Sequence, residues 1–305
     1  MRYVVTGAAG FIGSHLAEAL VAAGHEVLGV DCFTDYYDPA EKEANAAGLD
    51  VRRLDLAQDT LPLDGVDGVF HLAGQPGVRS FGDVFALYLR RNVLATQRVL
   101  HAGAAAGVRV VLASSSSVYG DAEAYPTSED AEPKPISPYG ITKLGCEHLA
   151  RAYAAGFELD AVVVRYFTVY GPRQRPDMLF RRVCEALLGG ATFEVFGGGL
   201  QSRSFTEVGD AVAATVAAME RAPAGALYNV GGGDEASVLE SIALLERLSG
   251  RALDVRHAGE AKGDVRRTRA DVSRIRAALG WEPRTRLEDG LARMWSWASG
   301  RVAAG

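Results

Sequence analysis

The chain contains 305 residues, 48% of them hydrophobic and 23% charged, with a formal net charge of -6, as is ordinary for one large or two modest globular domains. Its lysines and arginines form no dense cluster, which argues against a dedicated nucleic-acid surface. No apolar run approaches the roughly 18 residues of a membrane span. We therefore expect a soluble protein that partners neither nucleic acid nor membrane.

The cysteines of the chain, Cys32, Cys146 and Cys184, lack the spacing of a metal-binding motif and cannot all pair. Small buried side chains in a reducing compartment account for them. A glycine-rich segment begins at Gly7, too close to Met1 for a removable signal peptide. We expect no metal site and a cytoplasmic location.

The first elements are a short buried strand from Arg2 to Val5 and a helix that follows the segment TGAAGFIG. Gly7 permits a tight turn, Gly10 lets the backbone approach a pyrophosphate, and Gly13 lets the helix pack close to the sheet. The N-terminus of the helix would face the phosphates. This segment therefore predicts a dinucleotide-binding site.

The next strand, His25 to Val30, ends at Asp31. A carboxylate at this position accepts hydrogen bonds from the adenosine ribose and repels a 2′-phosphate. The sequence therefore predicts NAD, in preference to NADP, as the cofactor.

Strand-like and amphipathic helical segments alternate along the first half of the chain, which predicts an α/β fold with a doubly wound parallel sheet. The strand-like segments are Tyr3 to Val5, Val27 to Val30, Val51 to Asp55, Gly68 to Leu72, Val108 to Ala113 and Ala161 to Tyr166.

The alternation breaks from Gly171 to Gly199, after which a helix from Asp210 to Arg221 and a strand from Ala226 to Val230 return to the first domain. We expect that domain to comprise residues 1–168 plus about 205–231. A smaller domain, about 169–204 plus 232–305 and including the amphipathic stretch from Leu287 to Ser299, would lie over the carboxyl ends of the strands.

The segment SPYGITK places Tyr139 and Lys143 four residues apart on a predicted helix, and therefore on one helix face. A phenol has an ordinary pKa of about 10 and is a poor base at neutral pH. A nearby ammonium group stabilises the phenolate. The pair indicates a redox site that uses a tyrosinate.

Together these segments resemble the extended short-chain dehydrogenase/reductases that act on nucleotide sugars, over nearly the whole chain. The likeness is carried by TGAAGFIG, Asp31, the pair Asp55 and Leu56, HLAG from His71, Tyr88 with Asn92, ASSSSVYG, SPYGITK and LGWEPRTRLEDGL. It implies a Rossmann-like domain that binds NAD and a smaller C-terminal domain that binds the substrate. The implied cofactor contacts are Gly7, Gly10, Phe11, Ile12, Gly13, Asp31, Asp55, Leu56, Leu72, Ala73, Asn92, Tyr139 and Lys143.

In such enzymes the active serine or threonine lies four residues before the tyrosine of the VYG motif, which corresponds to Ser115. The resemblance implies that Ser115 hydrogen-bonds the sugar 4-hydroxyl and shares its proton with Tyr139, while Lys143 binds the nicotinamide ribose. The neighbouring serines leave the register open. Ser116 is the second choice, and hydrogen bonds to the backbone account for the others.

HLAGQPGVRS, the serine run and RYFTVYGPRQRPDM resemble the UDP-glucuronate 4-epimerases in particular. The resemblance implies that Thr168 and Arg175 hold the C6 carboxylate, since an arginine fork binds carboxylates bidentately. Arg175 could instead be a solvated loop residue or contact the diphosphate. The full set of implied substrate contacts is Arg79, Ser115, Ser116, Thr168, Arg175, Arg203, Asp264 and Arg267.

Within this set, Arg203 corresponds to an arginine used on the UDP diphosphate. Asp264 and Arg267 could reach the uridine or its phosphates, with surface salt bridges as the alternative. Two departures leave the substrate open: Ser204 replaces a usual aspartate, and YGITK replaces a segment that more often contains an alanine pair.

The implied reaction is an NAD-dependent 4-epimerisation, from UDP-glucuronate to UDP-galacturonate through a 4-keto intermediate, in a homodimer. The alternatives are a UDP-glucuronate decarboxylase and a 4-epimerase of a neutral UDP-hexose. Thr168 argues against the decarboxylase, which typically has asparagine there. A catalytically silent NAD-binding scaffold is the alternative from another class, and the joint presence of Ser115, Tyr139 and Lys143 counts against it.

Overall fold

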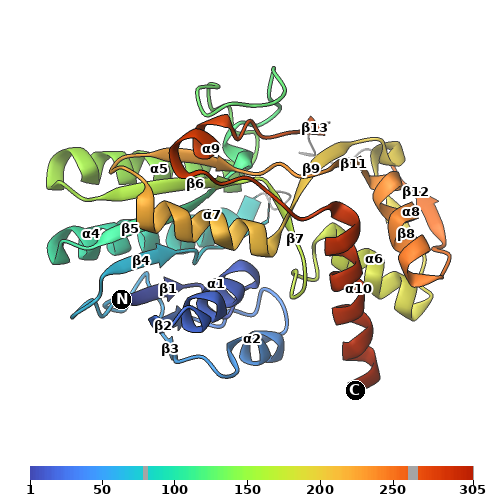
Figure 1. Ribbon diagram of the computed structural model, residues 1–305, viewed down its shortest axis with the longest axis horizontal. Coiled ribbons are helices and arrows are strands. Elements are labelled where there is room, and N and C mark those ends of the chain that lie inside the picture. The colour runs from blue at the N-terminus through green and yellow to red at the C-terminus, as the bar shows by residue number, and fades with distance from the viewer. Residues whose placement is uncertain (78–81, 260–266, 305) are drawn as a thin grey trace.

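The structure, a computed structural model, describes residues 1–77, 82–259 and 267–304. The larger domain contains a seven-stranded parallel sheet in the order β10-β6-β5-β4-β1-β2-β3 (Figure 1). Its strands are β1 (Arg2–Thr6), β2 (Glu26–Asp31), β3 (Val51–Arg53), β4 (Gly68–His71), β5 (Arg109–Ser115), β6 (Ala161–Tyr166) and β10 (Leu227–Val230). The predicted doubly wound α/β fold is confirmed.

The strand order reverses between β1 and β4, which are adjacent and parallel. From β1 the chain proceeds outward through β2 and β3, and from β4 it proceeds the other way through β5 and β6. Ligands of such sheets bind outside the carboxyl ends of the strands at this switch point. The loops that follow β1 and β4 therefore form the centre of the expected site.

Helices cover both faces of the sheet, because its strands are apolar on both sides; all six residues of β6 are buried. One core cluster joins the sheet to α1 and α7, and another joins it to α4 and α5 (Figure 1). The helical elements of this domain are α1 (Phe11–Ala22), α2 (Pro39–Ala46), η1 (Gly82–Val84), α3 (Phe85–Tyr88), the π-helical η2 (Leu89–Leu94), α4 (Ala95–Ala106), η3 (Ser116–Val118), α5 (Pro138–Phe157), α7 (Val208–Arg221) and α9 (Ser273–Leu279).

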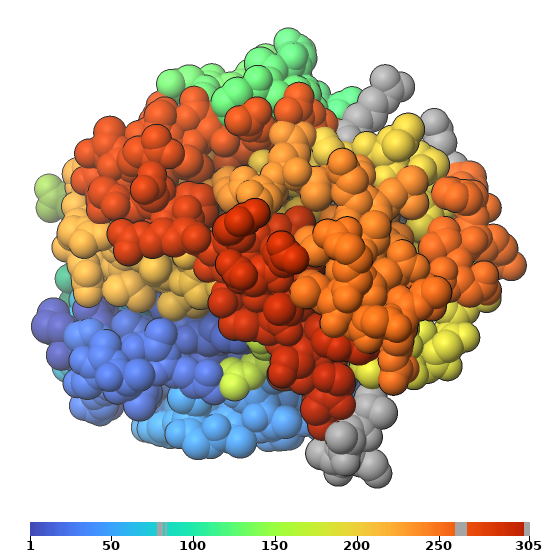
Figure 2. All heavy atoms as spheres, turned by 45° about the vertical axis from the view of Figure 1, so that its right-hand side comes forward, coloured from blue at the N-terminus to red at the C-terminus, as the bar shows by residue number. Residues whose placement is uncertain are grey.

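The smaller domain packs its helices around a separate apolar core that contains Phe180, Phe205 and Leu245. In its larger sheet β9 pairs with β7, β11 and β13, and β8 pairs with β12 in a second sheet. Its elements are β7 (Thr168–Tyr170), α6 (Leu179–Gly189), β8 (Phe193–Val195), η4 (Gly197–Gly199), β9 (Ser202–Glu207), β11 (Glu235–Ser237), α8 (Val238–Ser249), β12 (Val255–His257), β13 (Arg267–Thr268) and α10 (Leu287–Ala304). Figure 2 shows the C-terminal helix, in red, between the blue N-terminal region and the orange α8 region.

The domain boundaries differ from the expectation at α9. We expected residues 232–305 to belong to the smaller domain, but Ile275 and Leu279 of α9, with the following Trp281, belong to the core of the parallel sheet. The Trp281 indole also donates a hydrogen bond to the Asp210 carbonyl of α7. The apolar face of α9 requires this cover, so the C-terminal region spans both domains.

No helix in the described ranges has the length and apolarity to cross a membrane. Within the same ranges no cluster of His, Cys, Asp and Glu is arranged to hold a metal ion. All of the cysteines are free thiols. Cys146 and Cys184 are buried, whereas Cys32 is exposed at the carboxyl end of β2, so the expectation of a buried side chain was wrong for Cys32.

Candidate active site

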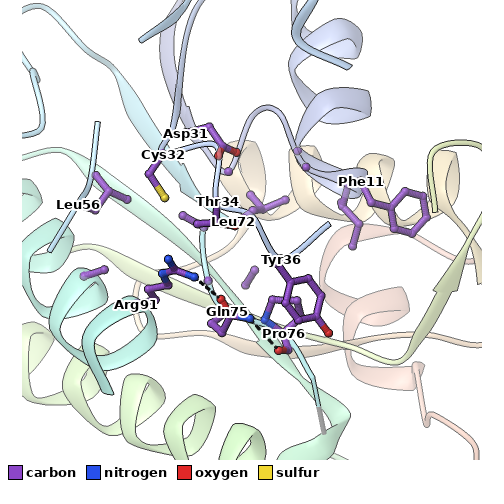
Figure 3. A pocket seen from close by; sticks show the side chains of 18 of the residues that line it. Phe11, Asp31, Cys32, Thr34, Tyr36, Leu56, Leu72, Gln75, Pro76 and Arg91 are labelled. Carbon is purple, nitrogen blue, oxygen red and sulfur yellow. Dashed lines mark hydrogen bonds between the residues drawn. The ribbon is translucent and has the colours of Figure 1, made fainter. Parts of the chain in front are cut away.

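Two cavities meet at the carboxyl ends of the strands. The glycine-loop cavity, of about 210 Å³, lies over β1, β2 and β4 (Figure 3). The interdomain cavity, of about 590 Å³, lies between the parallel sheet and the smaller domain. The residues that line both are Phe11, Ile12, Tyr36, Pro76, Ser114, Tyr139, Tyr166 and Arg175. Molecules bound in the two cavities would therefore meet along this shared wall.

The glycine loop is shaped for a backbone approach that side chains would prevent. Gly7 has a positive φ of 73°, and a Cβ there would lie 2.9 Å from the Ala73 nitrogen. A Cβ on Gly13 would overlap the Gly7 carbonyl oxygen. Gly10 is the N-cap of α1 and has no side chain to cap the first helical amides. Those amides are available to an anionic group, and the loop fits a dinucleotide pyrophosphate.

Asp31 lies beside this loop at the end of β2 and lines the glycine-loop cavity. Its carboxylate accepts hydrogen bonds from the Ala9 amide at 3.2 Å and the Phe33 amide at 2.8 Å. These contacts fix the carboxylate at the cavity wall, where a ribose could use its remaining acceptor capacity.

Asp55 and Leu56 line the cavity just beyond β3. The predicted strand from Val51 to Asp55 ends at Arg53, because the Asp55 carboxylate accepts a hydrogen bond from the Ala57 amide and turns the chain. Burial would raise the pKa of Asp55, but hydrogen bonding from Arg90, at 2.6 Å, makes the net shift downward. Asp55 is thus an ionised and already paired part of the wall.

The loop after β2 supplies cavity residues that the sequence patterns did not reveal. Thr34, Tyr36, Tyr37 and Lys42 line the glycine-loop cavity, and Lys42 donates to the carbonyl and hydroxyl oxygens of Thr34 at 2.6 and 2.7 Å. Burial and the nearby Asp31 raise the pKa of Tyr37 to about 12. Only the position of this loop in the chain could have indicated these residues, because the loop follows a strand that ends at the predicted site.

Asn92 does not line either cavity, contrary to the expected cofactor contact. It is buried, with its side-chain oxygen accepting from the Gln75 amide at 2.6 Å and its nitrogen donating to the Gln75 carbonyl and the Thr142 hydroxyl. Asn92 therefore fixes Gln75, which does line the cavity together with Leu72 and Ala73. Figure 3 shows Gln75 accepting a hydrogen bond from Arg91.

Tyr139 is located in the first turn of α5 and lines both cavities. Ser137 caps this turn by accepting a hydrogen bond from the Gly140 amide at 3.1 Å. Lys143 is buried, donates to the Ala113 carbonyl at 2.9 Å, and places its Nζ 5.9 Å from the centre of the Tyr139 ring. Strand β5 and helix α5 thus hold a phenol and an ammonium group together.

The serine run divides into different roles. Ser114 donates to Glu147 Oε1 at 2.5 Å, which accounts for its hydroxyl. The Ser115 hydroxyl accepts from the Ser117 amide and lines the interdomain cavity with Tyr139. Ser116 lies on η3 and is absent from both cavity linings, so the structure does not place this second choice at the site.

A buried polar network supports the serine run from behind. Glu147 accepts two hydrogen bonds from the Arg165 guanidinium, at 2.9 and 2.6 Å, in an almost fully buried pair. Arg165 also donates to the Tyr119 hydroxyl at 2.7 Å. Nearby, burial and the charge of Lys143 lower the pKa of His71 to about 3, so this imidazole is neutral at physiological pH.

Thr168, Arg175 and Arg203 line the interdomain cavity. Arg175 is already bidentate to Asp177: Nε lies 3.0 Å from Oδ1, and a terminal nitrogen lies 3.1 Å from Oδ2. Burial alone would lower the pKa of Arg175, but Asp177 gives a net upward shift. Arg203 donates from a terminal nitrogen to the Ser202 carbonyl.

Arg267 is not among the lining residues of the interdomain cavity, in contrast to its predicted substrate contact. Its guanidinium pairs with Glu235 at 2.6 and 2.7 Å and lies over the Tyr125 ring. Strands β11 and β13 flank β9 and bring these partners together, which satisfies the fork before any substrate binds. Arg79 and Asp264, two further predicted contacts, lie outside the described residues.

Comparison with known proteins gives a consistent match. A family model described as "NAD dependent epimerase/dehydratase family" matches residues 3–231. The chain is 40% identical over 303 residues to a protein named uncharacterized UDP-glucose epimerase YtcB of Bacillus subtilis, covering 95% of this chain and 96% of that one.

Two solved structures are similar over almost the full length. One is the UDP-glucuronic acid 4-epimerase from Bacillus cereus in complex with UDP-glucuronic acid and NAD, with a TM-score of 0.95, 38% identity, and 99% and 100% of the two chains covered. The other is MoeE5, solved with NAD and either UDP-glucuronic acid or UDP-glucose, with a TM-score of 0.89, 44% identity, and 99% and 100% covered.

Proposed function

The chain belongs to the NAD-dependent epimerase/dehydratase family, and from that premise we propose that it converts UDP-glucuronate to UDP-galacturonate. At the coarser level it is an NAD-dependent UDP-sugar 4-epimerase, an isomerase. The observation that supports the acid is that Arg175 and Thr168 line the interdomain cavity, which Tyr139 also lines.

The residues of the glycine-loop cavity fit NAD. Gly7, Gly10 and Gly13 would accommodate the diphosphate, Asp31 would accept from the adenosine ribose, and Lys143 would contact the nicotinamide ribose. When bound, NAD would supply the hydride acceptor for C4 of the sugar and, once reduced, the donor that returns the hydride to the other face of the 4-keto intermediate.

Tyr139 is the proposed base that removes the proton of the sugar 4-hydroxyl, because it lines both cavities. Ser115, in the same wall, would hydrogen-bond that hydroxyl. The positive charge of Lys143 stabilises negative charge on the Tyr139 oxygen. When the hydride returns, Tyr139 gives the proton back to the sugar oxygen. These side chains would have no purpose in a catalytically silent scaffold.

The 4-keto form of a glucuronate is a β-keto acid, which loses carbon dioxide when the carboxylate bond aligns with the carbonyl π system. An epimerase must therefore hold the carboxylate in another orientation. Thr168 and Arg175 are the proposed restraint. Arg175 gives its Nε edge to Asp177, so the outer terminal nitrogen remains for a sugar.

A neutral UDP-hexose is the second candidate substrate. Asp177 places a negative charge against Arg175 in the same cavity, so the pair carries no net charge. This compensation weakens the preference for an acidic sugar. A UDP-glucuronate decarboxylase fits less well, since its reaction requires the carboxylate to be released from such a restraint.

We also propose a homodimer that forms through η2, α4 and α5. Leu89 and Leu94 of η2 and Ile141 and Phe157 of α5 are exposed large apolar side chains, which a second copy would cover. A molar mass of one chain by light scattering at micromolar concentration would contradict this. The cytoplasmic location stays a prediction.

The test is incubation of the purified protein with UDP-glucuronate and, separately, with UDP-glucose, with products identified by proton NMR. We expect UDP-galacturonate from the first, without a pentose product. Turnover of UDP-glucose alone would replace the proposal by its second candidate. A 4-keto-pentose or pentose nucleotide as the main product would identify a decarboxylase.

Truncating Arg175 to alanine should weaken use of UDP-glucuronate far more than use of UDP-glucose, because only the acid forms an ion pair with the guanidinium. The freed β-keto acid should also yield a larger share of decarboxylated product by mass spectrometry. An equal effect on both sugars, without a new product, would make Arg175 a diphosphate or structural residue.

A further inference from the structure

Asp177 lines the interdomain cavity but has no role in the proposed epimerisation. Its carboxylate lines the cavity, and 41% of the side chain remains exposed. The neighbouring Arg175 side chain is 24% exposed. An acidic sugar would therefore bring a second carboxylate beside one guanidinium that already has a partner.

The geometry of the pair divides the guanidinium into two edges. Asp177 occupies the edge formed by Nε and one terminal nitrogen. In the described part of the chain, no hydrogen bond joins the other terminal nitrogen of Arg175 to protein, so a substrate can approach only from that end. A substrate carboxylate there gains a charge-assisted contact but lies close to the like charge of Asp177.

The C6 hydroxymethyl group of a neutral sugar would interact differently with the pair of Arg175 and Asp177. It can accept a hydrogen bond from Arg175 and donate one to Asp177, because each carboxylate oxygen has two acceptor positions. Oδ2 receives Arg175 and the Tyr36 hydroxyl, at 3.1 and 3.4 Å, while Oδ1 receives only Arg175 Nε among the described residues. A neutral sugar therefore uses both members of the pair.

We propose that Asp177 is a specificity-determining residue, whose charge limits the preference for a UDP-uronate and lets the same cavity accept a neutral UDP-hexose. The inference rests on the proposed UDP-sugar 4-epimerisation. Tyr36 keeps the carboxylate in place from the large domain: it lines both cavities, and burial and Asp177 raise its pKa to about 12, so its hydroxyl stays a donor.

The test is Asp177→Asn, which removes the charge at nearly constant volume. The measured quantity is kcat/KM for UDP-glucuronate divided by kcat/KM for UDP-glucose. We expect this ratio to rise roughly tenfold, mainly through a lower KM for the acid, as one like charge is removed. The ratio should also rise, by a smaller factor, when Asp177→Asn is added to Arg175→Ala, since the charge acts on the sugar directly.

Glu18→Gln is the matched control. Glu18 of α1 forms an ion pair with Arg173, which belongs to the same loop as Arg175 and Asp177. The Glu18 side chain is 42% exposed and does not line the interdomain cavity. Its removal should leave the ratio unchanged. Calorimetric binding of UDP, which has no sugar, should be the same in wild type and Asp177→Asn; if that variant fails to bind UDP, the ratio is measured with Asp177→Ser.

A ratio that falls or stays constant in the UDP-binding variant would overturn the inference and leave Asp177 as an orienting partner of Arg175. An effect that disappears in the Arg175→Ala background would overturn it in the same way. Failure of the wild-type protein to epimerise either sugar would be a different result, because it would remove the proposed function itself.

Discussion

At the residue scale, neighbouring residues fix the position of Tyr139. It stands in the first turn of α5, capped by Ser137, and lines both cavities. Gly140 follows it, and a Cβ at Gly140 would overlap the Ser117 carbonyl, so this glycine lets α5 approach the serine loop. Close approach of this kind brings the phenol and Ser115 into one wall.

Tyr139→Phe should keep the fold and bound NAD but lower kcat by at least roughly 10²-fold, because only the proton acceptor is removed. Tyr153→Phe is the control on the same helix, since the Tyr153 hydroxyl accepts from Gln97 away from both cavities. Turnover is followed by NMR and NAD content by absorbance of the released cofactor. Near wild-type turnover of Tyr139→Phe would assign the base elsewhere.

At the scale of elements, the contact between α1 and the glycine loop tolerates no side chain at Gly13. Gly13→Ala should therefore abolish NAD binding and lower the thermal midpoint. Gly145 of α5 has open space around a Cβ, so Gly145→Ala should stabilise the protein by about 0.5–1 kcal/mol. Calorimetry measures NAD binding by Gly13→Ala, and thermal unfolding measures the stability of both variants. Retained NAD affinity in Gly13→Ala would show that α1 can shift away from the loop.

Glu147 of α5 and Arg165 of β6 form an ion pair whose side chains are almost fully buried. Glu147→Ala should cost about 3–5 kcal/mol of unfolding free energy, because a buried guanidinium loses its partner. Glu26→Ala removes a surface partner of Arg2 and should cost less than about 1 kcal/mol. Urea unfolding compares them, and equal losses would contradict the role given to burial.

Several parts of the site were readable from the sequence because short-range patterns specify them. The strand, glycines and helix at the N-terminus, and the spacing of Tyr139 and Lys143, depend on local geometry. Pairings between distant loops do not. Arg267 meets Glu235 only because β11 and β13 flank β9, and Asn92 turns toward Gln75 from the π-helical segment η2.

At the scale of the whole molecule, Glu41 joins the two domains. From α2 of the large domain it accepts hydrogen bonds from Arg181 of α6 at 2.7 and 2.6 Å and from Arg301 of α10 at 2.9 Å. Burial alone would raise the pKa of Glu41, but the two arginines hold it below its usual 4.5. The carboxylate is therefore ionised while the domains are docked.

Because this pKa is lowered on folding, the stabilisation is fully present above about pH 4.5 and is lost as pH falls through the folded value. Glu41→Gln should thus be less stable than wild type by about 1.5–3 kcal/mol at neutral pH, with the difference shrinking below about pH 4. Urea unfolding across this range measures it. A difference that is constant with pH would exclude ionisation of Glu41 as the cause.

The serine run at the end of β5 affects which changes of chain length the site could tolerate during evolution. Ser114 and Ser115 are the last residues of β5: the Ser114 hydroxyl donates to Glu147 of α5, and Ser115 lines the interdomain cavity. Since Ser116 follows, the loss of one residue before the run would put Ser115 and Ser116 at these two positions. Such a deletion would preserve both the hydroxyl that binds Glu147 and the hydroxyl at the cavity, whereas an insertion would move Ala113 into the place of Ser114.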